Sequence, residues 1–282
     1  MAWNPLQKKP SLCIKPSLSQ GLSTHMEDRE LEMCFNNLQN LEDNCKKLYK
    51  EVKRYEECIN NLHKLEQNMS SELSNSPLIH EHENLRKVAE NYQSVTYQIG
   101  HNTDDLAQLS QKTVVDPLKK LNPEFGAIAG ALKRRDTALN EAIKAKAKWE
   151  KADKLEKTGT NVVRAEQAKK AWTAARDDYE TQNKLLLLEL PQFYDKRVDY
   201  FQPCLQALVR SQVNFYGESN GLFTHLVSTT SEKDEANDVA EGGQERTVKS
   251  SKLVPKVTSD KTFHEDLDKQ LSALRSLSIV GK

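Results

Sequence analysis

The feature that most constrains this chain is a series of apolar residues spaced alternately three and four positions apart, from Leu31 to Met69. Its members are Leu31, Phe35, Leu38, Leu41, Cys45, Leu48, Val52, Tyr55, Ile59, Leu62, Leu65 and Met69. A mean step close to 3.5 residues is typical of the buried seam of a supercoiled α-helix. The chain has only 10 Gly and 9 Pro in 282 residues, so turns are few and long helices are favoured.

Two more long helices are expected, one from Pro77 to about Lys157 and one from Thr160 to Leu226. Proline removes a backbone donor and crowds the preceding turn, so it kinks a helix. The predicted kink positions are Pro117, Pro123, Pro191 and Pro203. At 1.5 Å per residue, three such helices are each roughly 70 to 120 Å long, too long for a globule. The sequence therefore predicts an all-α fold, a kinked antiparallel three-helix coiled coil whose seam is completed by a partner chain.

Composition divides the chain into four segments. Residues 1–25 are basic and contain three prolines, so we expect a flexible segment that forms neither a signal peptide nor a continuous helix. Residues 26–227 hold the helical domain, and Thr24 with Glu27 has the spacing of a capping box at its start. Residues 228–260 are polar and predicted to be a disordered linker. Residues 261–282 form a short amphipathic helix, which is expected to dock on the bundle because it is too short to be stable alone.

The stretch "LKRRDTALNEAIKAKAKWEKADKLEKTG", residues 132–159, gathers nine Lys and Arg, although the whole chain has 41 basic and 41 acidic residues. At 100° per residue, Leu132, Leu139 and Ile143 define a buried line, and a group of lysines lies about 100° to 160° away with no acid among them. The candidate surface cations are Lys133, Arg134, Lys144, Lys148, Lys151, Lys154 and Lys157.

Side chains that all carry positive charge cannot form the i,i+4 ion pairs that are common on solvated helices. We interpret these cations as a surface for anionic lipid headgroups, where each Lys contributes about 1 kcal/mol. Two other interpretations stay open: a solvated helix face, and a surface for an acidic protein on a structural scaffold without lipid affinity.

Other functions have weaker support. "HEHEN" (80–84) has Asn84 where a zinc-protease motif needs His, so no metal or cofactor is expected. No nucleophile motif is present, which argues against an enzyme. Nucleic acid is disfavoured because residues 26–75 hold eleven acids against seven bases. Five cysteines without a C-x-x-C pair favour a reducing compartment.

Four stretches carry a resemblance to a known family: "KTVVDPLKK" (112–120), "LKRRDTAL" (132–139), "ELPQFYDKRVDYFQPCLQALVRSQVNFY" (189–216) and "LSALRSLSIV" (271–280). They resemble the BAR-domain family, amphiphysin type, over roughly residues 26–226 and the last dozen. The resemblance implies a BAR fold that dimerises into a crescent-shaped six-helix bundle. It also implies a cytoplasmic protein, peripheral at membranes and cortical actin, that senses curvature in cytokinesis and endocytosis.

The expected partners are therefore a second copy of the chain, an anionic phospholipid surface and, by resemblance alone, regulators of the actin cytoskeleton. The candidate dimer contacts are Leu62, Leu65, Tyr92, Leu208 and Phe215. The chain departs from larger amphiphysin-type relatives because it has no SH3 domain, so recruitment of proline-rich partners is not expected.

Overall fold

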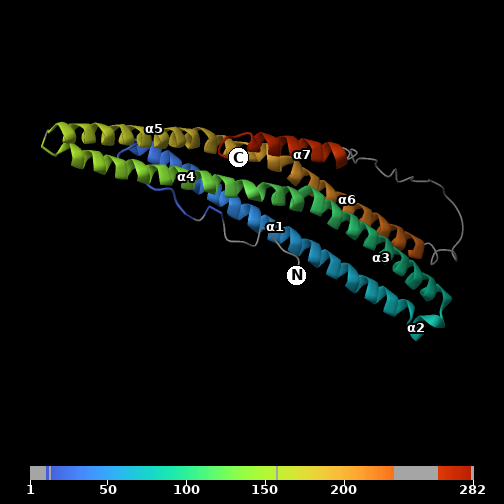
Figure 1. Ribbon diagram of the computed structural model, residues 1–282. Helices are drawn as coiled ribbons and strands as arrows, with labels where there is room; N and C mark the ends of the chain where they lie inside the picture. The colour runs from blue at the N-terminus through green and yellow to red at the C-terminus, as the bar shows by residue number, and fades with distance from the viewer. Residues whose placement is uncertain (1–10, 13, 157, 232–259, 281–282) are drawn as a thin grey trace. The chain divides into compact units, whose positions relative to one another are not determined.

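The computed structural model describes residues 11–12, 14–156, 158–231 and 260–280, and these residues are mostly helical with no strand among them. The elements are α1 (His25–Ser74), α2 (Pro77–His80), α3 (Glu83–Ser110), the π-helical turn η2 (Gln111–Val115), α4 (Asp116–Asp153), α5 (Gly159–Asp195), α6 (Arg197–Ser231) and α7 (Asp260–Arg275), drawn in Figure 1. The predicted all-α class is confirmed.

The chain divides into two compact units. Unit 1 comprises Met1–Leu48, Leu118–Phe201 and Glu265–Lys282, and unit 2 comprises Tyr49–Pro117 and Gln202–His264. The long helices α1, α4 and α6 each contribute residues to both units.

Unit 1 is built from the first half of α1, most of α4, α5 and the docked α7. Helices α4 and α5 run side by side and are joined by the short turn after Asp153 (Figure 1). Their facing aromatic rings interlock, and Phe125 meets Phe193 edge to face with centroids 6.1 Å apart. Phe35 and Leu190 are fully buried in the same unit. Burial of these apolar faces provides the main driving force for packing.

Unit 2 is built from the second half of α1 with α3 and α6. Its interior includes polar contacts between helices, since Ser70 and Thr96 share a hydrogen bond of 2.8 Å between their hydroxyl groups. Gly100 of α3 lies against His63 of α1, because a Cβ atom there would lie 2.5 Å from Nε2 of His63. A glycine at this position lets α3 lie directly against α1.

The second and third predicted helices are each interrupted. After α2 the backbone becomes extended at His82, with φ −120° and ψ 102°, so the helix from Pro77 stops after one turn and α3 begins at Glu83. Before Pro117 the chain makes the π-helical turn η2, in which the N–H of Asp116 bonds to the carbonyl of Gln111. This wider turn accommodates the proline, which donates no hydrogen bond of its own.

The other proline positions do not end a helix. Pro123, Pro191 and Pro203 lie inside α4, α5 and α6, so kinks there stay a prediction. The break in the third predicted helix falls instead at Lys196, between α5 and α6.

Part of the segment before α1, which we predicted to be flexible, makes hydrogen bonds to α1. We call residues 11, 12 and 14–24 the N-terminal arm. The backbone N–H groups of Ser11 and Leu12 donate to the buried carboxylate of Glu42 at 2.6 and 3.0 Å, and Gln39 donates to the carbonyl of Leu12. A carboxylate buried inside a helical unit requires such donors, which explains why the arm is held.

The predicted capping box is confirmed at the end of the arm. The N–H of Glu27 donates to the hydroxyl of Thr24, and the Glu27 carboxylate accepts the N–H of Thr24 at 2.8 Å. These reciprocal bonds satisfy two backbone donors and begin α1 at His25. Residues 1–10 and most of the predicted linker, 232–259, lie outside the described part of the chain.

The C-terminal helix α7 packs on unit 1. Its apolar residues Leu267, Leu271 and Leu274 are buried. Its polar contacts include an ion pair between Asp268 and Lys120 of α4. The amphipathic pattern thus has an apolar face in contact with unit 1 and a polar face outside.

Candidate functional site

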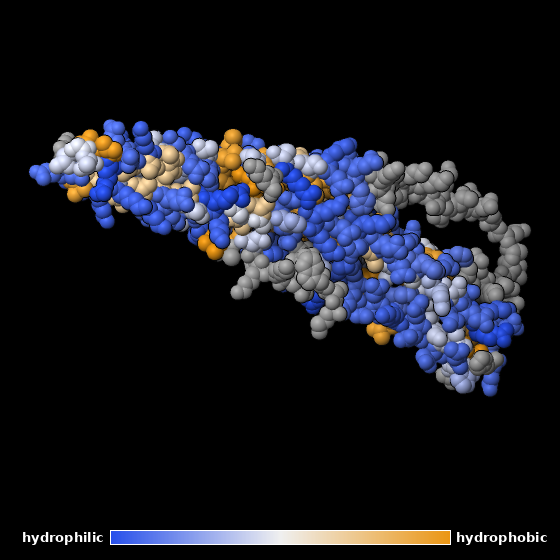
Figure 2. All heavy atoms as spheres, viewed as in Figure 1, coloured by the Kyte–Doolittle hydropathy of each residue, from blue (hydrophilic) through white to orange (hydrophobic). Residues whose placement is uncertain are grey.

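The cations predicted on α4 reach the surface. Lys133, Arg134, Lys144, Lys148, Lys151 and Lys154 are all exposed; Lys157 lies outside the described residues. We call these six exposed residues the distal cations. The surface in Figure 2 is mostly hydrophilic, with small apolar patches.

The distal cations have no ion-pair partner among the described residues, whereas some of the charges on other helices are paired. Examples of pairs one helical turn apart are Lys46–Glu42, Lys87–Glu83 and Arg176–Glu180. Four of the distal cations, Lys133, Lys144, Lys148 and Lys151, lie on one helix flank. Unpaired cations on one flank leave a local positive potential that a paired surface would cancel. The arrangement therefore suits a ligand with many negative charges.

The returning helix α5 adds to this positive surface. Arg164, Lys169 and Lys170 are exposed and likewise lack an ion pair within the described ranges. Apolar side chains stand beside them, since Leu155, Val162 and Val163 are about half exposed. The end of the α4–α5 pair thus combines cations with aliphatic groups.

Arg135 is a basic residue of the same stretch that was not among the predicted surface cations. It is fully buried, with no exposed surface. On the helical wheel it lies among Ala138, Leu139 and Ala142, which form a core cluster with Tyr179. Its position on the helical wheel beside Ala142 is a signal that the sequence analysis did not use, and this signal distinguishes Arg135 from its neighbours Lys133 and Arg134.

The guanidinium of Arg135 is surrounded by acceptors. Its Nε donates to Oδ1 of Asn183 at 3.1 Å, and Nη2 donates to the hydroxyl of Tyr179 at 3.0 Å. Asp28 and Asp136 form ion pairs with it at 3.6 and 2.9 Å. A buried charge requires this number of partners, so Arg135 is a structural residue of unit 1.

The same network holds the N-terminal arm. Arg135 Nη1 also donates to the carbonyl of Ser17, whose N–H and hydroxyl donate to Asp136. Asp28 accepts the N–H and the hydroxyl of Ser19. One buried arginine thus links the arm, α1, α4 and α5.

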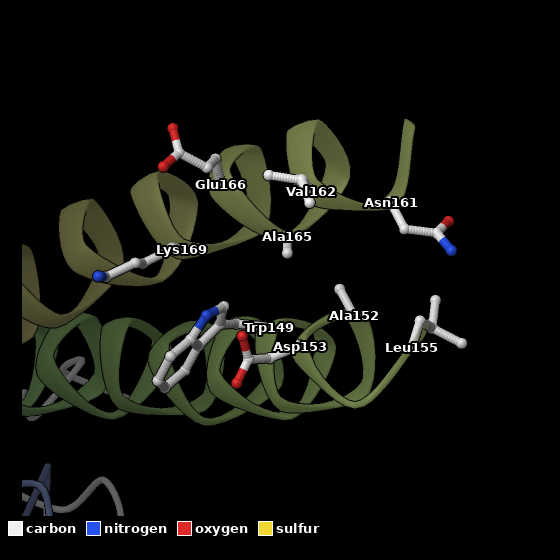
Figure 3. A pocket seen from close by; sticks show the side chains of 9 residues that line it. All are labelled: Trp149, Ala152, Asp153, Leu155, Asn161, Val162, Ala165, Glu166 and Lys169. Carbon is white, nitrogen blue, oxygen red and sulfur yellow. The ribbon is translucent and has the colours of Figure 1, made fainter. Parts of the chain in front are cut away.

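A cavity of about 240 Å³ opens between α4 and α5 near their shared turn. Its lining residues are Trp149, Ala152, Asp153, Leu155, Asn161, Val162, Ala165, Glu166 and Lys169 (Figure 3). Trp149, which lines the cavity, stacks on Trp172 with ring centroids 4.8 Å apart and planes at 2°. Ala152 and Ala165 point toward each other across the gap, and their small side chains leave it unfilled.

The described residues show no other recognisable chemical site. No cluster of three or more His, Cys, Asp or Glu within this part of the chain is arranged to hold a metal. None of the helices in the described ranges is both long and apolar enough to traverse a bilayer. The exposed positive surface is therefore the main candidate.

The predicted dimer contacts fall in different environments. Leu62 and Leu65 on α1 are 53% and 66% exposed, which is unusual for leucine. Tyr92 and Leu208 are half-buried, and Phe215 is buried in unit 2. Sequence reasoning missed further exposed apolar residues in the same unit: Met69, Leu73, Leu205, Val209, Val213 and Tyr216. Phe215 therefore packs in the core of unit 2, and the exposed apolar surface of this unit is formed by the other residues named here.

These features define a class of protein. The BAR domain profile matches residues 19–232, and the chain belongs to the BAR domain family. The BAR domain of amphiphysin from Drosophila has the same fold, with a TM-score of 0.56 and 18% identity over 74% of this chain and 95% of that chain. The predicted BAR fold is confirmed.

Curated relatives refine the comparison. The chain is 32% identical to "Bridging integrator 3" of Rattus norvegicus over 282 residues, which cover 100% of this chain and 99% of the relative. It is 30% identical to "Regulator of cytoskeleton and endocytosis RVS161" of Candida albicans over 136 residues, 47% of this chain and 50% of that protein.

Proposed function

We propose that this chain is a homodimeric adaptor that binds anionic, curved membranes through the distal cations and couples them to the actin cytoskeleton in endocytosis and cytokinesis. The observation that carries the proposal is the set of exposed cations on α4 without ion pairs, in a member of the BAR domain family.

Charge favours a membrane as the partner. Each lysine near an anionic surface contributes about 1 kcal/mol, so four lysines contribute about 4 kcal/mol, or roughly a thousandfold in affinity. The half-exposed Leu155, Val162 and Val163 support the same partner, because aliphatic groups gain from reaching the acyl boundary. A soluble acidic protein would offer no apolar phase for them.

Dimerisation supports the proposal by doubling the number of cations. Unit 2 exposes aliphatic stripes on α1 and α6, and Tyr55 and Tyr216 of these helices lie with their hydroxyls 3.5 Å apart. Exposed leucines and valines at three- and four-residue spacing are typical of a surface that packs on another helix. A second copy of the chain would cover this surface and form the six-helix dimer. The link to the cytoskeleton and to endocytosis is supported by the Candida albicans relative, which is named as a regulator of cytoskeleton and endocytosis.

The test is co-sedimentation with phosphatidylserine-rich vesicles of two sizes and with neutral vesicles. Wild type is compared with a variant in which Lys133, Lys144, Lys148 and Lys151 are changed to Glu. A matched control reverses the same number of charges at the exposed cations of α1: Lys47, Lys50, Arg54 and Lys64.

We expect wild type and the α1 control to sediment with anionic vesicles and to favour small ones. The α4 variant is expected to stay in the supernatant as a folded dimer. Screening weakens the attraction beyond about 8 Å at physiological salt, so binding should fall as salt rises. Equal binding by the two reversed variants would contradict the role of α4. Absence of binding by wild type would favour a scaffold that meets an acidic protein.

A further inference from the structure

The residues after α7 are fastened to α5 by a single carboxylate. Glu189 accepts a hydrogen bond from the hydroxyl of Ser278 at 2.7 Å on Oε1 and from the N–H of Ile279 at 2.8 Å on Oε2. Ser278 is exposed, whereas Ile279 and Val280 are buried. Both oxygens of one side chain thus hold the end of this segment in place.

The rest of α7 is held by its buried leucines and by a few more polar contacts. Arg275 pairs with the buried Glu124 of α4 at 2.5 Å, and Lys196 donates to the carbonyl of Ala273 at 3.0 Å. The helix has only 16 residues, and helices of this length are marginal alone in water. Docking of α7 is therefore sensitive to a change at its end.

We propose that Ser278 is a phosphorylation site and that its phosphorylation releases α7 from unit 1. A protein kinase transfers the γ-phosphoryl group of ATP to the Ser278 hydroxyl oxygen. The new P–O bond replaces the bond to the bridging oxygen, ADP leaves, and the hydroxyl proton is lost to a base of the kinase.

The chemistry of the site decides the direction of the effect. Phosphorylation removes the O–H donor to Glu189 and adds about −1.5 to −2 charge within hydrogen-bond range of a carboxylate. Glu189 has no ion-pair partner among the described residues that could offset the repulsion. The Ile279 N–H bond to the same carboxylate is lost when the segment moves away.

Arg275 explains how a kinase would select Ser278. It lies three residues before the serine, where acidic pockets of arginine-directed kinases bind a guanidinium in an extended peptide. In the docked state Arg275 is held by Glu124, and the segment around Ser278 is folded. The kinase therefore acts on the undocked segment, and the phosphate then prevents its return.

Ser276 provides a matched control in the same turn. It is also exposed, but its hydroxyl donates to the carbonyl of Ala273 within its own segment and does not contact a carboxylate in the described structure. A phosphate at 276 adds the same charge without meeting Glu189.

The experiment uses the full chain with phosphoserine encoded at position 278 or 276. Hydrogen exchange of residues 263–280 is measured by mass spectrometry. We expect phosphoserine 278 to raise exchange about 10- to 100-fold, the range that corresponds to loss of a charge-assisted hydrogen bond. Phosphoserine 276 is expected to leave exchange near that of the unmodified chain. Equal exchange in the 278 form and the unmodified chain would overturn the proposal.

A rescue separates repulsion from a general loss of structure. Glu189→Gln keeps an acceptor for Ile279 and removes the negative charge, so it should reduce the effect of phosphoserine 278 severalfold. In a second arm, the unmodified chain is incubated with ATP and a kinase that selects arginine three residues before serine. Label on Ser278 that disappears in Arg275→Ala supports the proposal, and label on Ser276 in place of Ser278 refutes the selection.

Discussion

Replacing Arg135 with alanine should destabilise unit 1 more than any other single change among its basic residues. The substitution leaves the amide oxygen of buried Asn183 without the guanidinium donor and removes the ion-pair partner of the half-buried Asp28 carboxylate. Removing one partner of a buried charge network costs about 3 to 5 kcal/mol. At about 2 to 4 °C per kcal/mol for a chain of this size, the melting temperature should fall by ~6 to 20 °C.

The measurement is calorimetric or urea unfolding of the full chain, with Arg134→Ala as the control. Arg134 is the adjacent residue and is exposed, so its loss should change stability by no more than about 0.5 kcal/mol. Arg135→Lys should give an intermediate loss, because an ammonium cannot reproduce the planar fork of donors.

Hydrogen exchange of the N-terminal arm provides a second readout. Exchange should rise in Arg135→Ala, because Ser17 loses its link to the guanidinium. If Arg135→Ala melted within about 2 °C of Arg134→Ala, the reasoning from burial would be wrong.

Two more predictions concern thiols and the exposed leucines. Burial raises the pKa of Cys45 and of Cys204 from 9.0 to about 12, and the Glu42 carboxylate adds to the shift at Cys45. The contribution of these thiols to stability is therefore fully present below pH 9. It is lost as pH rises from 9 toward 12, because in this range the thiols ionise in the unfolded chain but stay neutral in the folded one. Between pH 8 and pH 10, ionisation of the two thiols in the unfolded chain should lower the free energy of unfolding by about 3 kcal/mol. Urea unfolding of a double variant, Cys45→Ala with Cys204→Ala, should therefore show a fall in unfolding free energy over this pH range that is about 3 kcal/mol smaller than that of wild type. The double change Leu62→Glu with Leu65→Glu should convert the dimer to a monomer in sedimentation equilibrium. The control Leu85→Glu, at an exposed leucine of α3, should leave the dimer intact. If the double variant were still a dimer, this face of α1 would not be part of the dimer interface.

Much of the fold follows from short-range patterns in the sequence. Thr24 and Glu27 identify the start of α1 because capping depends on residues only three positions apart. The apolar spacing identifies the long helices because every turn repeats the same requirement. The break after α2 lacks such a signal, since His82 adopts an extended backbone without a Gly or Pro to mark it.

The candidate site was predictable only where exposure follows from helix geometry. Lys133 and Lys144 are exposed because they lie on a flank away from the seam. The contacts of the arm and of α7 join residues far apart in sequence, such as Ser17 with Asp136 and Glu189 with Ser278. No local pattern encodes these pairs, so Glu42 and Glu189 resemble ordinary surface acids until the structure is known.

Unit 1 is assembled from stretches that are far apart in the sequence, and this has a consequence for the synthesis of the chain. The unit draws on three separate stretches, and Lys120 meets Asp268 across 148 positions. A ribosome that has made the first 201 residues has therefore produced most of unit 1 but none of α7. During that interval the surfaces that will bury Leu267, Leu271 and Leu274 are open to water or to chaperones. Translation arrested before Asp260 would thus release a nascent chain with an uncovered apolar surface, by which quality control could recognise it.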